Sequence, residues 1–118
     1  MFEFPTFEEK MDKLTEDYLK LSKKEIKQEF SKLKHWKIVK GKLHREIEFS
    51  SFEDAISFMA RASFEVAKMD HHPEWSNVYN KVVIDLITHD VDGLSNYDFS
   101  LAKSLDQIIA TFKTKRKK

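Results

Sequence analysis

Glycine and proline are scarce in this chain, and their positions constrain its fold more than any other feature. The 118 residues include only two glycines and two prolines. Because these residue types usually mark turns and the ends of helices, each of them should lie at a boundary between long elements. We expect one domain, since a chain of this length is too short for two separate cores.

Two helices are predicted before the first glycine. Pro5 precedes a segment at about 6–21 with an apolar stripe of Phe7, Met11, Leu14 and Tyr18 at helical spacing. Ser22 and Glu25 form a capping box, so a second helix should begin there and extend to about Leu33. Gly41 then separates two runs of alternating apolar and polar residues, at 36–38 and 43–49, which predicts a β-hairpin.

A long helix is predicted from Ser50 and Glu53, acting as its cap, to about Met69. Its apolar residues span an arc of roughly 200°, about twice the width needed to face one core. Phe58 lies near the edge of that arc on the helical wheel. We interpret the excess width as a surface for a partner chain and expect an oligomer.

The segment Asn77–Ile87 is rich in β-branched residues that alternate in character. One face would hold Val78, Val82, Ile84 and Leu86, and the other Tyr79, Val83 and Ile87. The segment is long for one strand, so it is either one strand with a bend or bulge, or a pair of strands. Asp92-Gly93 predicts a turn, and a capping box at Ser95 and Asp98 should begin a last helix that ends near Phe112. This order of elements indicates an α+β domain with helices on one face of a small antiparallel sheet.

Composition and charge exclude several classes of function. A net charge of +1 argues against direct nucleic-acid binding, which needs a basic face. No apolar run approaches the roughly 20 residues of a membrane span, and the first residues lack the order of a signal peptide. We therefore expect a soluble protein of the cytoplasm, with a nuclear location left open. The basic end, KTKRKK, is either a solvated terminus or an anion-binding tail.

Adjacent histidines, His71 and His72, precede Pro73 where the long helix must stop. Neighbours in an extended segment point in opposite directions, so the two imidazoles could contact different parts of one ligand. The turn should hold them rigidly and leave them partly wet. His89 should end the strand at 77–87, and three imidazoles could then line one pocket.

Three interpretations of the histidines remain open on spacing alone. They could cap and fill a turn, or bind zinc, or perform acid–base chemistry. A zinc site is disfavoured because adjacent histidines are unusual ligands and no HExxH pair is present. Imidazole titrates near neutrality, and no GxSxG, P-loop, GxGxxG or cysteine offers another chemistry. Proton transfer is therefore the reaction type to expect.

Several linked motifs resemble the pterin-4a-carbinolamine dehydratase family. They are FxxFxxAxxFMxR at Phe49 to Arg61, DHHPEW, NVYNKV, THD and GLSxxDxxLA, and they extend over roughly Ser22 to Phe112. The resemblance implies a four-stranded antiparallel sheet with helices packed on one face. It defines a domain at 22–112, preceded by an N-terminal helical extension at 1–21 and followed by a basic tail at 113–118.

The resemblance also implies an activity. Members dehydrate 4a-hydroxytetrahydrobiopterin to quinonoid dihydrobiopterin in the recycling of tetrahydrobiopterin, with no metal or organic cofactor. They are often tetramers, built by pairing of sheet edges and by packing of the long helices. Some animal members bind a homeodomain transcription factor as a dimerisation cofactor. The alternative function is therefore a protein-binding module with little or no enzymatic activity.

Carried over residue by residue, the resemblance implies catalytic roles for His71, His72 and His89. His71 and His89 are candidate acids at the leaving hydroxyl, and His72 would hold the ring and assist at N5. The residues expected to bind substrate are Asp70, Trp75, Ile87, Thr88, Asp90 and Asp98, although Trp75 fits the core equally well. The family often has Glu where this chain has Ala67 and Arg where it has Tyr97, which puts substrate preference and rate in question.

Overall fold

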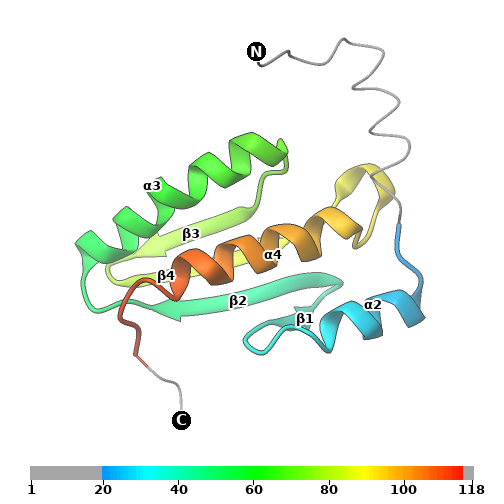
Figure 1. Ribbon diagram of the computed structural model, residues 1–118, viewed down its shortest axis with the longest axis horizontal. Helices are drawn as coiled ribbons and strands as arrows, with labels where there is room; N and C mark the ends of the chain where they lie inside the picture. Colours follow the sequence, from blue (N-terminus) through cyan, green and yellow to red (C-terminus); the bar gives the residue numbers. More distant parts are fainter. Residues whose placement is uncertain (1–19, 116–118) are drawn as a thin grey trace.

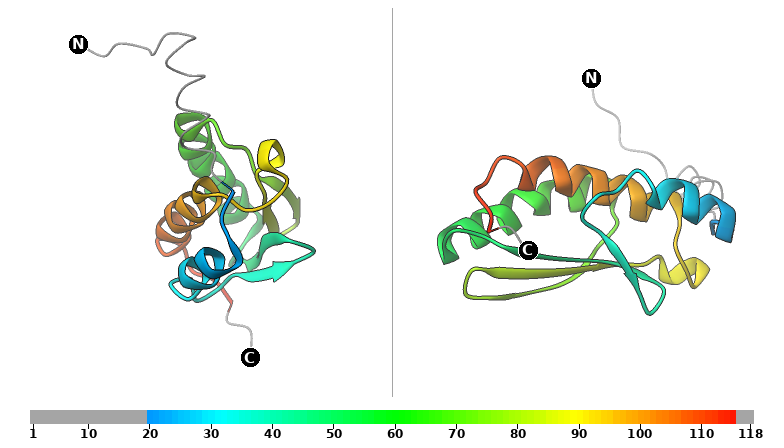
Figure 2. Two further views of the ribbon diagram at one scale, coloured as in Figure 1. Left: turned by 90° about the vertical axis from the view of Figure 1, so that its right-hand side faces the viewer. Right: turned by 90° about the horizontal axis from the view of Figure 1, so that it is seen from below.

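The computed structural model describes residues 20–115, which form a four-stranded antiparallel sheet with three α-helices on one face. The views of Figures 1 and 2 show α2, α3 and α4 on the same side of the sheet, with the other side uncovered. The α+β class and the four-stranded sheet with helices on one face are confirmed. The helix expected at 6–21 lies almost wholly outside the described residues.

The sheet has the strand order β1-β2-β4-β3. Its strands are β1 (Lys37–Val39), β2 (Lys42–Glu48), β3 (Glu74–Val78) and β4 (Lys81–Leu86). The predicted hairpin at Gly41 is present, with Lys40 and Gly41 at φ 52° and 77°. Positive φ at both central residues is the geometry that suits a two-residue hairpin turn.

The segment at 77–87 belongs to two strands, which answers the question left open by the sequence. Tyr79 adopts φ 52° in a tight turn, and Val78 pairs with Lys81 across it. Val78 and Val82 were expected to share one face of the sheet, and this prediction is wrong. The turn places Val78 on the uncovered face, with 76% of its surface exposed. Residues Val82, Ile84 and Leu86 do share one buried face.

The helices are α2 (Lys23–Phe30), α3 (Phe52–Met69) and α4 (Asn96–Ile109). Capping boxes at Ser22 and Ser95 are present as predicted. The cap predicted for α3 is wrong by one residue, because Ser51 accepts from the Asp54 amide at 3.1 Å. The Ser50 hydroxyl instead donates to the Lys113 carbonyl at 3.2 Å. None of the described helices is long and apolar enough to cross a bilayer.

The core lies between the helices and the covered face of the sheet. It contains the buried face of β2 and β4, the inner stripe of α3 and most of the inner side of α4. Phe58 was expected near the edge of the apolar arc of α3, but it is fully buried and stacks on Phe49 with ring centroids 5.2 Å apart. The most exposed aromatic residue of α3 is instead Phe64, at 76%, followed by Phe52 at 43%.

Candidate functional site

The two adjacent histidines follow a sharp end to α3. Asp70 adopts a left-handed conformation with φ 51° and ψ 42°, and its amide donates to carbonyls of the last helical turn. The chain then becomes extended, and neighbouring side chains point in opposite directions. The His71 residue is 6% exposed, whereas the side chain of His72 is 71% exposed. The expectation of two partly wet histidines is therefore correct for His72 and wrong for His71.

His71 is held by a buried carboxylate. Its Nε2 lies 2.7 Å from Oδ1 of Asp98, which is completely buried. The other carboxylate oxygen, Oδ2, accepts from the Thr88 hydroxyl at 2.7 Å and from the Ser95 amide at 2.9 Å. Both carboxylate oxygens of Asp98 therefore have polar partners, and the short contact at Oδ1 holds the Nε2 edge of His71 against Asp98. The carboxylate thereby fixes the orientation of the imidazole.

The same residues connect the site to the start of α4. Asp98 is the third residue of that helix, and its bond to the Ser95 amide is half of the capping box. The Ser95 and Thr88 hydroxyls lie 2.6 Å apart, both buried. The helix cap therefore performs two tasks, since it begins α4 and it sets the position of the carboxylate that holds His71.

His89 does not end a strand, which corrects the sequence prediction. β4 ends at Leu86, and His89 begins a short 3₁₀ turn, His89–Val91. The loop is closed by hydrogen bonds between Thr88 and Gly93, with Thr88 N to Gly93 O at 2.9 Å and Gly93 N to Thr88 O at 3.3 Å. This closure presents the His89 side chain, 74% exposed, beside the two other histidines.

A cavity of about 190 Å³ joins these elements. Its lining residues are Asp70, His71, His72, Ile87, Thr88, His89 and Asp90. All three predicted histidines therefore meet in one place, together with four of the predicted substrate-binding residues. Asp98 lies beneath His71 and is not part of the lining, and Trp75 packs half-buried against the core from β3.

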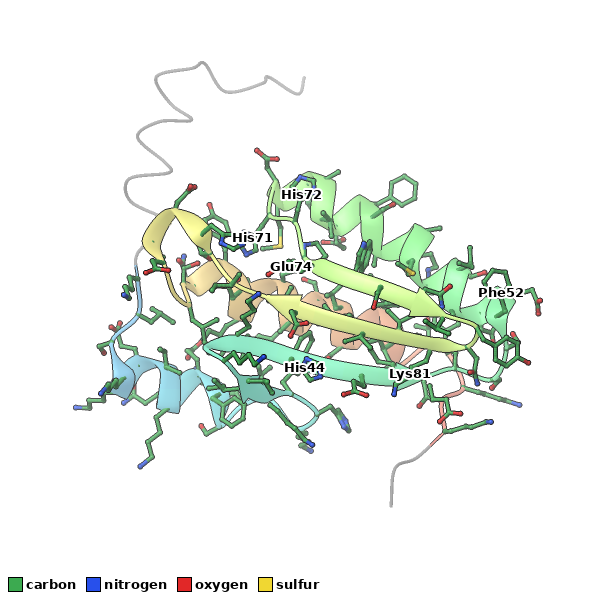
Figure 3. All side chains as sticks on the ribbon, turned by 180° about the vertical axis from the view of Figure 1, so that it is seen from behind. His44, Phe52, His71, His72, Glu74 and Lys81 are labelled. Carbon is green, nitrogen blue, oxygen red and sulfur yellow. The ribbon has the colours of Figure 1, made fainter. Side chains whose placement is uncertain are left out.

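The rim of the cavity is more polar and more exposed than its floor. Nε2 of His72 lies 3.5 Å from Oδ1 of Asp70, and Nε2 of His89 lies 3.8 Å from Oε1 of Glu74. That Glu74 oxygen also accepts from Lys42 Nζ at 2.8 Å. The ion pair with Lys42, followed by the nearby His89, lowers the pKa of Glu74. Figure 3 shows Glu74 near His71 and His72, with Phe52 at the opposite end of the sheet.

Two residues near the histidines have no role predicted from the sequence, Glu74 and Tyr97. Glu74 lies within the HHPE motif, and only the pairing of β3 with β4, and of β4 with β2, brings Lys42 beside it. Tyr97, noted only as a departure from the family pattern, places its ring centroid 5.9 Å from that of His71. Ala67, the other departure, is exposed on the last turns of α3.

A larger cavity, of about 680 Å³, lies beside β2 and the end of α4. Two pairs of its charged side chains lie within the lining, Arg45 with Asp106 and Lys115 with Glu48, whereas Glu46 pairs with Lys81 outside it. Among the described residues that line this cavity, His35 is the only histidine, so those residues do not form the cluster of proton-transfer groups seen in the smaller cavity. Within residues 20–115, no group of three or more histidine, cysteine, aspartate or glutamate side chains is arranged to hold a metal ion.

The smaller cavity is chemically suited to moving protons on a bound ring. One imidazole is buried and oriented by a carboxylate, while two others stand at the rim with carboxylates beside them. Imidazole can donate or accept a proton near neutral pH, and geometry of this kind can serve a donor and an acceptor in one reaction.

Comparisons with known proteins agree with this chemistry. The profile of the family described as Pterin 4 alpha carbinolamine dehydratase matches residues 19–108. A relative from Solibacter usitatus (strain Ellin6076) is 47% identical over 91 residues, covering 77% of this chain and 96% of the relative. Another, from Chelativorans sp. (strain BNC1), is 44% identical over 93 residues, covering 77% and 95%. Both carry the name pterin-4-alpha-carbinolamine dehydratase as a provisional assignment.

A solved structure is similar over the same region. It is the crystal structure of a protein from Brucella melitensis described as a transcriptional coactivator/pterin dehydratase. The TM-score is 0.73 at 35% sequence identity, and the match covers 76% of this chain and 98% of that one.

Proposed function

This chain belongs to the pterin 4 alpha carbinolamine dehydratase family, and we propose that it dehydrates 4a-hydroxytetrahydrobiopterin to quinonoid dihydrobiopterin. The observation that carries the proposal is the convergence of His71, His72 and His89 on one cavity. The reaction would use these imidazoles without a metal or organic cofactor, and it would serve tetrahydrobiopterin recycling in the cytoplasm, with a nuclear location also open.

The reaction requires two proton movements at adjacent atoms of the pterin, C4a and N5. The 4a-hydroxyl must receive a proton to leave as water, and N5 must lose one as the C4a–N5 double bond forms. The sum is loss of one water with no change of oxidation state, so no redox partner is consumed. A site with several imidazoles in reach of one ring can supply both movements.

His71 is best placed to act as the acid at the hydroxyl. Because its Nε2 faces Asp98, the proton passed to the substrate would leave from Nδ1, and the imidazole would remain oriented throughout. His89, on the loop opposite, is the second candidate for this acid. Neither assignment excludes the other, since the two residues could serve different faces of the substrate.

His72 would hold the pterin ring and assist at N5. Its exposed imidazole stands at the rim, beside Asp70, where it can meet a ligand without disturbing the core. Asp70 and Asp90 would orient the rim imidazoles, and the backbone of Ile87 and Thr88 would meet the hydrogen-bonding edge of the pterin. Asp98 acts through His71 in this scheme, and Trp75 supports β3 from the core side.

A direct assay tests the proposal. Purified protein is mixed with chemically generated 4a-hydroxytetrahydrobiopterin, and formation of the quinonoid product is followed by absorbance against the spontaneous rate. We expect acceleration that survives metal chelation, is greatly reduced in His71→Ala and is retained in His35→Ala, a histidine outside the smaller cavity. A rate equal to the spontaneous rate would exclude this function.

We further propose that the subunits assemble into a tetramer. Phe52, Ile56 and Phe64 are 43%, 42% and 76% exposed and lie on one side of α3. At about 100° per residue, the exposed small residues Ala60, Ser63 and Ala67 fall between or beside them. A stripe that joins large apolar and small residues favours close packing of a second helix, and exposed apolar patches of this kind mark interaction surfaces.

The sheet supplies a second candidate contact. β1 pairs only with residues 42–44 of β2, so among the described residues no named strand pairs with the outer edge of the remainder of β2. Such an edge is a template for another strand. A tetramer could combine edge pairing with helix packing, in keeping with closed symmetric assembly.

Light scattering at micromolar concentration tests assembly. We expect a mass near four times the 14.0 kDa subunit. Phe64→Glu should reduce the mass with the fold intact, whereas Tyr79→Glu, at another well-exposed aromatic site on the β3–β4 turn, should not. A monomer at all concentrations would contradict the tetramer.

A protein-binding role is the second candidate. The description of the Brucella melitensis neighbour as a transcriptional coactivator as well as a pterin dehydratase favours it. In that case the three histidines would be dispensable. This role would be favoured over catalysis if the parent protein did not accelerate dehydration and His71→Ala still bound the partner fully.

A further inference from the structure

His89 lies on a loop that leaves the sheet where β4 ends. Two backbone hydrogen bonds between Thr88 and Gly93 close this loop. The buried Thr88 hydroxyl, which donates to Asp98 at 2.7 Å, anchors its base. The side chain of His89, in contrast, is 74% exposed. The base of the loop is therefore held by the core, whereas packing restrains the imidazole itself only weakly.

Glu74 approaches that imidazole from the sheet. Its Oε1 lies 3.8 Å from Nε2 of His89, a separation at which a carboxylate attracts a protonated imidazole. Glu74 begins β3 and follows His72 by two residues. Alternate residues of an extended chain point to the same side, and Figure 3 shows these two side chains near each other. Glu74 thus connects the segment that carries His72 with the loop that carries His89.

Lys42 holds the Glu74 carboxylate from a more distant strand. Its Nζ donates to the same Oε1 at 2.8 Å. Because β4 lies between β2 and β3, this ion pair crosses the uncovered face close to the end of β4, where Asp85 pairs with Glu74. The bond from Lys42 lowers the pKa of Glu74, so the carboxylate is negatively charged near neutral pH. An anion is therefore fixed beside the point from which the loop of His89 starts.

We propose that Glu74 is a positioning residue for His89, and that Lys42 acts through Glu74 by holding its carboxylate in place. The carboxylate attracts the protonated imidazole and restrains it at the mouth of the cavity. Glu74 is not among the residues that line this cavity, so the role requires no contact with the substrate. The effect on reaction rate rests on the proposed dehydratase function, whereas the restraint of the ring does not.

Three variants test this series of contacts. Glu74→Gln removes the negative charge at nearly equal size, and Lys42→Met removes the cation. Lys81→Met is the matched control, because Lys81 forms an ion pair of similar length, 2.9 Å, with Glu46 on the same face of the sheet. Since exposed ion pairs contribute little, kcat should fall by about 2–5-fold in Glu74→Gln and by less in Lys42→Met. It should change by less than about 1.5-fold in Lys81→Met.

A double-mutant cycle with His89→Ala shows whether Glu74 acts through His89. In that background Glu74→Gln should change kcat by less than about 1.5-fold, because the ring that it positions is absent. An equal loss of kcat in the parent protein and in His89→Ala would overturn the proposal. A parental kcat in Glu74→Gln would overturn the effect on rate.

Carbon-13 relaxation of the His89 ring gives a readout that does not depend on activity, because it reports the mobility of the ring on a fast timescale. Spectra are recorded at about pH 5.5, where free imidazole is protonated, and the signal is assigned by its loss in His89→Gln. We expect the ring to become more mobile in Glu74→Gln and, to a smaller extent, in Lys42→Met. Lys81→Met should match the parent protein.

The relaxation result separates this proposal from the proposed function. An equally restrained His89 ring in Glu74→Gln and in the parent would overturn the role of Glu74, whether or not the protein dehydrates the pterin. Absence of dehydration by the parent would overturn the proposed function alone, because ring mobility would still decide whether Glu74 positions His89.

Discussion

Two histidines of this chain each contact an aspartate at 2.7 Å, one on the floor of the cavity and one on the uncovered face of the sheet. On the floor, His71 Nε2 meets Asp98, and the residues are 6% and 0% exposed. On the sheet, His44 Nδ1 meets Asp85, whose side chain is 30% exposed. The distances are equal, yet only the first pair lies at the candidate site (Figure 3).

The surroundings of the two histidine–aspartate pairs explain why only one of them belongs to the candidate site. His44 has a carboxylate at each ring nitrogen, since its Nε2 lies 3.0 Å from Glu46, which also pairs with Lys81 at 2.9 Å. The bond to Glu46, together with that to Asp85, raises the pKa of His44 against the opposing effect of its burial. His44 is thus held between Asp85 on the neighbouring strand β4 and Glu46 on its own strand β2, whereas His71 lines a cavity. A short histidine–aspartate distance alone does not identify a catalytic pair.

The same substitution in both pairs gives the largest expected contrast. Asp98→Asn should lower kcat for dehydration by about 10²-fold or more, because the oriented imidazole loses its carboxylate. The amide nitrogen of asparagine would also face at least one of the present donors, and an unsatisfied buried donor costs about 1–3 kcal/mol of unfolding free energy. Steady-state kinetics and urea unfolding measure the two effects.

Asp85→Asn is the matched control for Asp98→Asn. It alters a contact of equal length outside the cavity, so kcat should stay within about 2-fold of the parent value, and the smaller loss of stability should match a partly exposed pair. Equal losses of kcat in the two variants would contradict the distinction between the two regions.

Within the cavity, His71 and His72 should separate rate from binding. His71→Ala should lower kcat by about 10²–10⁴-fold, with a smaller effect on the affinity for a pterin analogue. It should also lower the unfolding free energy by about 1–3 kcal/mol, because buried Asp98 loses a donor. His72→Ala should weaken analogue binding and slow the reaction without changing the thermal midpoint, since its side chain is 71% exposed.

Analogue titration, steady-state kinetics and thermal melts of the two single variants and the double variant measure these effects. Turnover near that of the parent in the double variant would refute catalysis by these histidines. Collapse of its fold would instead indicate that they mainly fill the turn.

Local patterns in the sequence predicted much of this structure. The capping boxes at Ser22 and Ser95 and the turn at Gly41 depend on neighbours within four residues, and all are present. The apolar arc of α3 was also visible, but the sequence could not show that Phe58 faces the core and Phe64 faces solvent. An arc wider than one core allows several rotations of the helix, and only packing against the sheet and α4 selects one.

The candidate site was predictable only to the extent that it depends on local sequence patterns. The spacing of the motifs indicated that His71, His72 and His89 belong together, and alternation indicated that the first two diverge. Which of the two is buried depends on the left-handed turn at Asp70 and on Asp98, which is 27 residues from His71. The link from Lys42 to Glu74 depends on strand register, which crosses 32 residues. Contacts of this length have no local signature.

The smallest expected effect is the pH dependence that His44 gives to stability. Its pKa in the folded protein is raised above the ordinary value of 6.5. A raised pKa means that the contribution is fully present below about pH 6.5 and is lost as the pH rises through the folded-state pKa. With its side chain 18% exposed, we expect about 0.5–1 kcal/mol from the pairs with Asp85 and Glu46.

Urea unfolding of the parent protein and of His44→Gln at about pH 6 and pH 9 tests this contribution, because linkage relates the change in stability to proton uptake. The unfolding free energy of the parent should fall further between these values than that of the variant, while the dehydration rates of the two proteins should follow the same pH profile. Parallel stability curves would show that the paired carboxylates do not favour the charged form of His44. A shift in the pH profile of dehydration would show that the pair of His44 and Asp85 does affect the reaction. The charge of His44 on the uncovered face of the sheet would then influence proton transfer in the cavity.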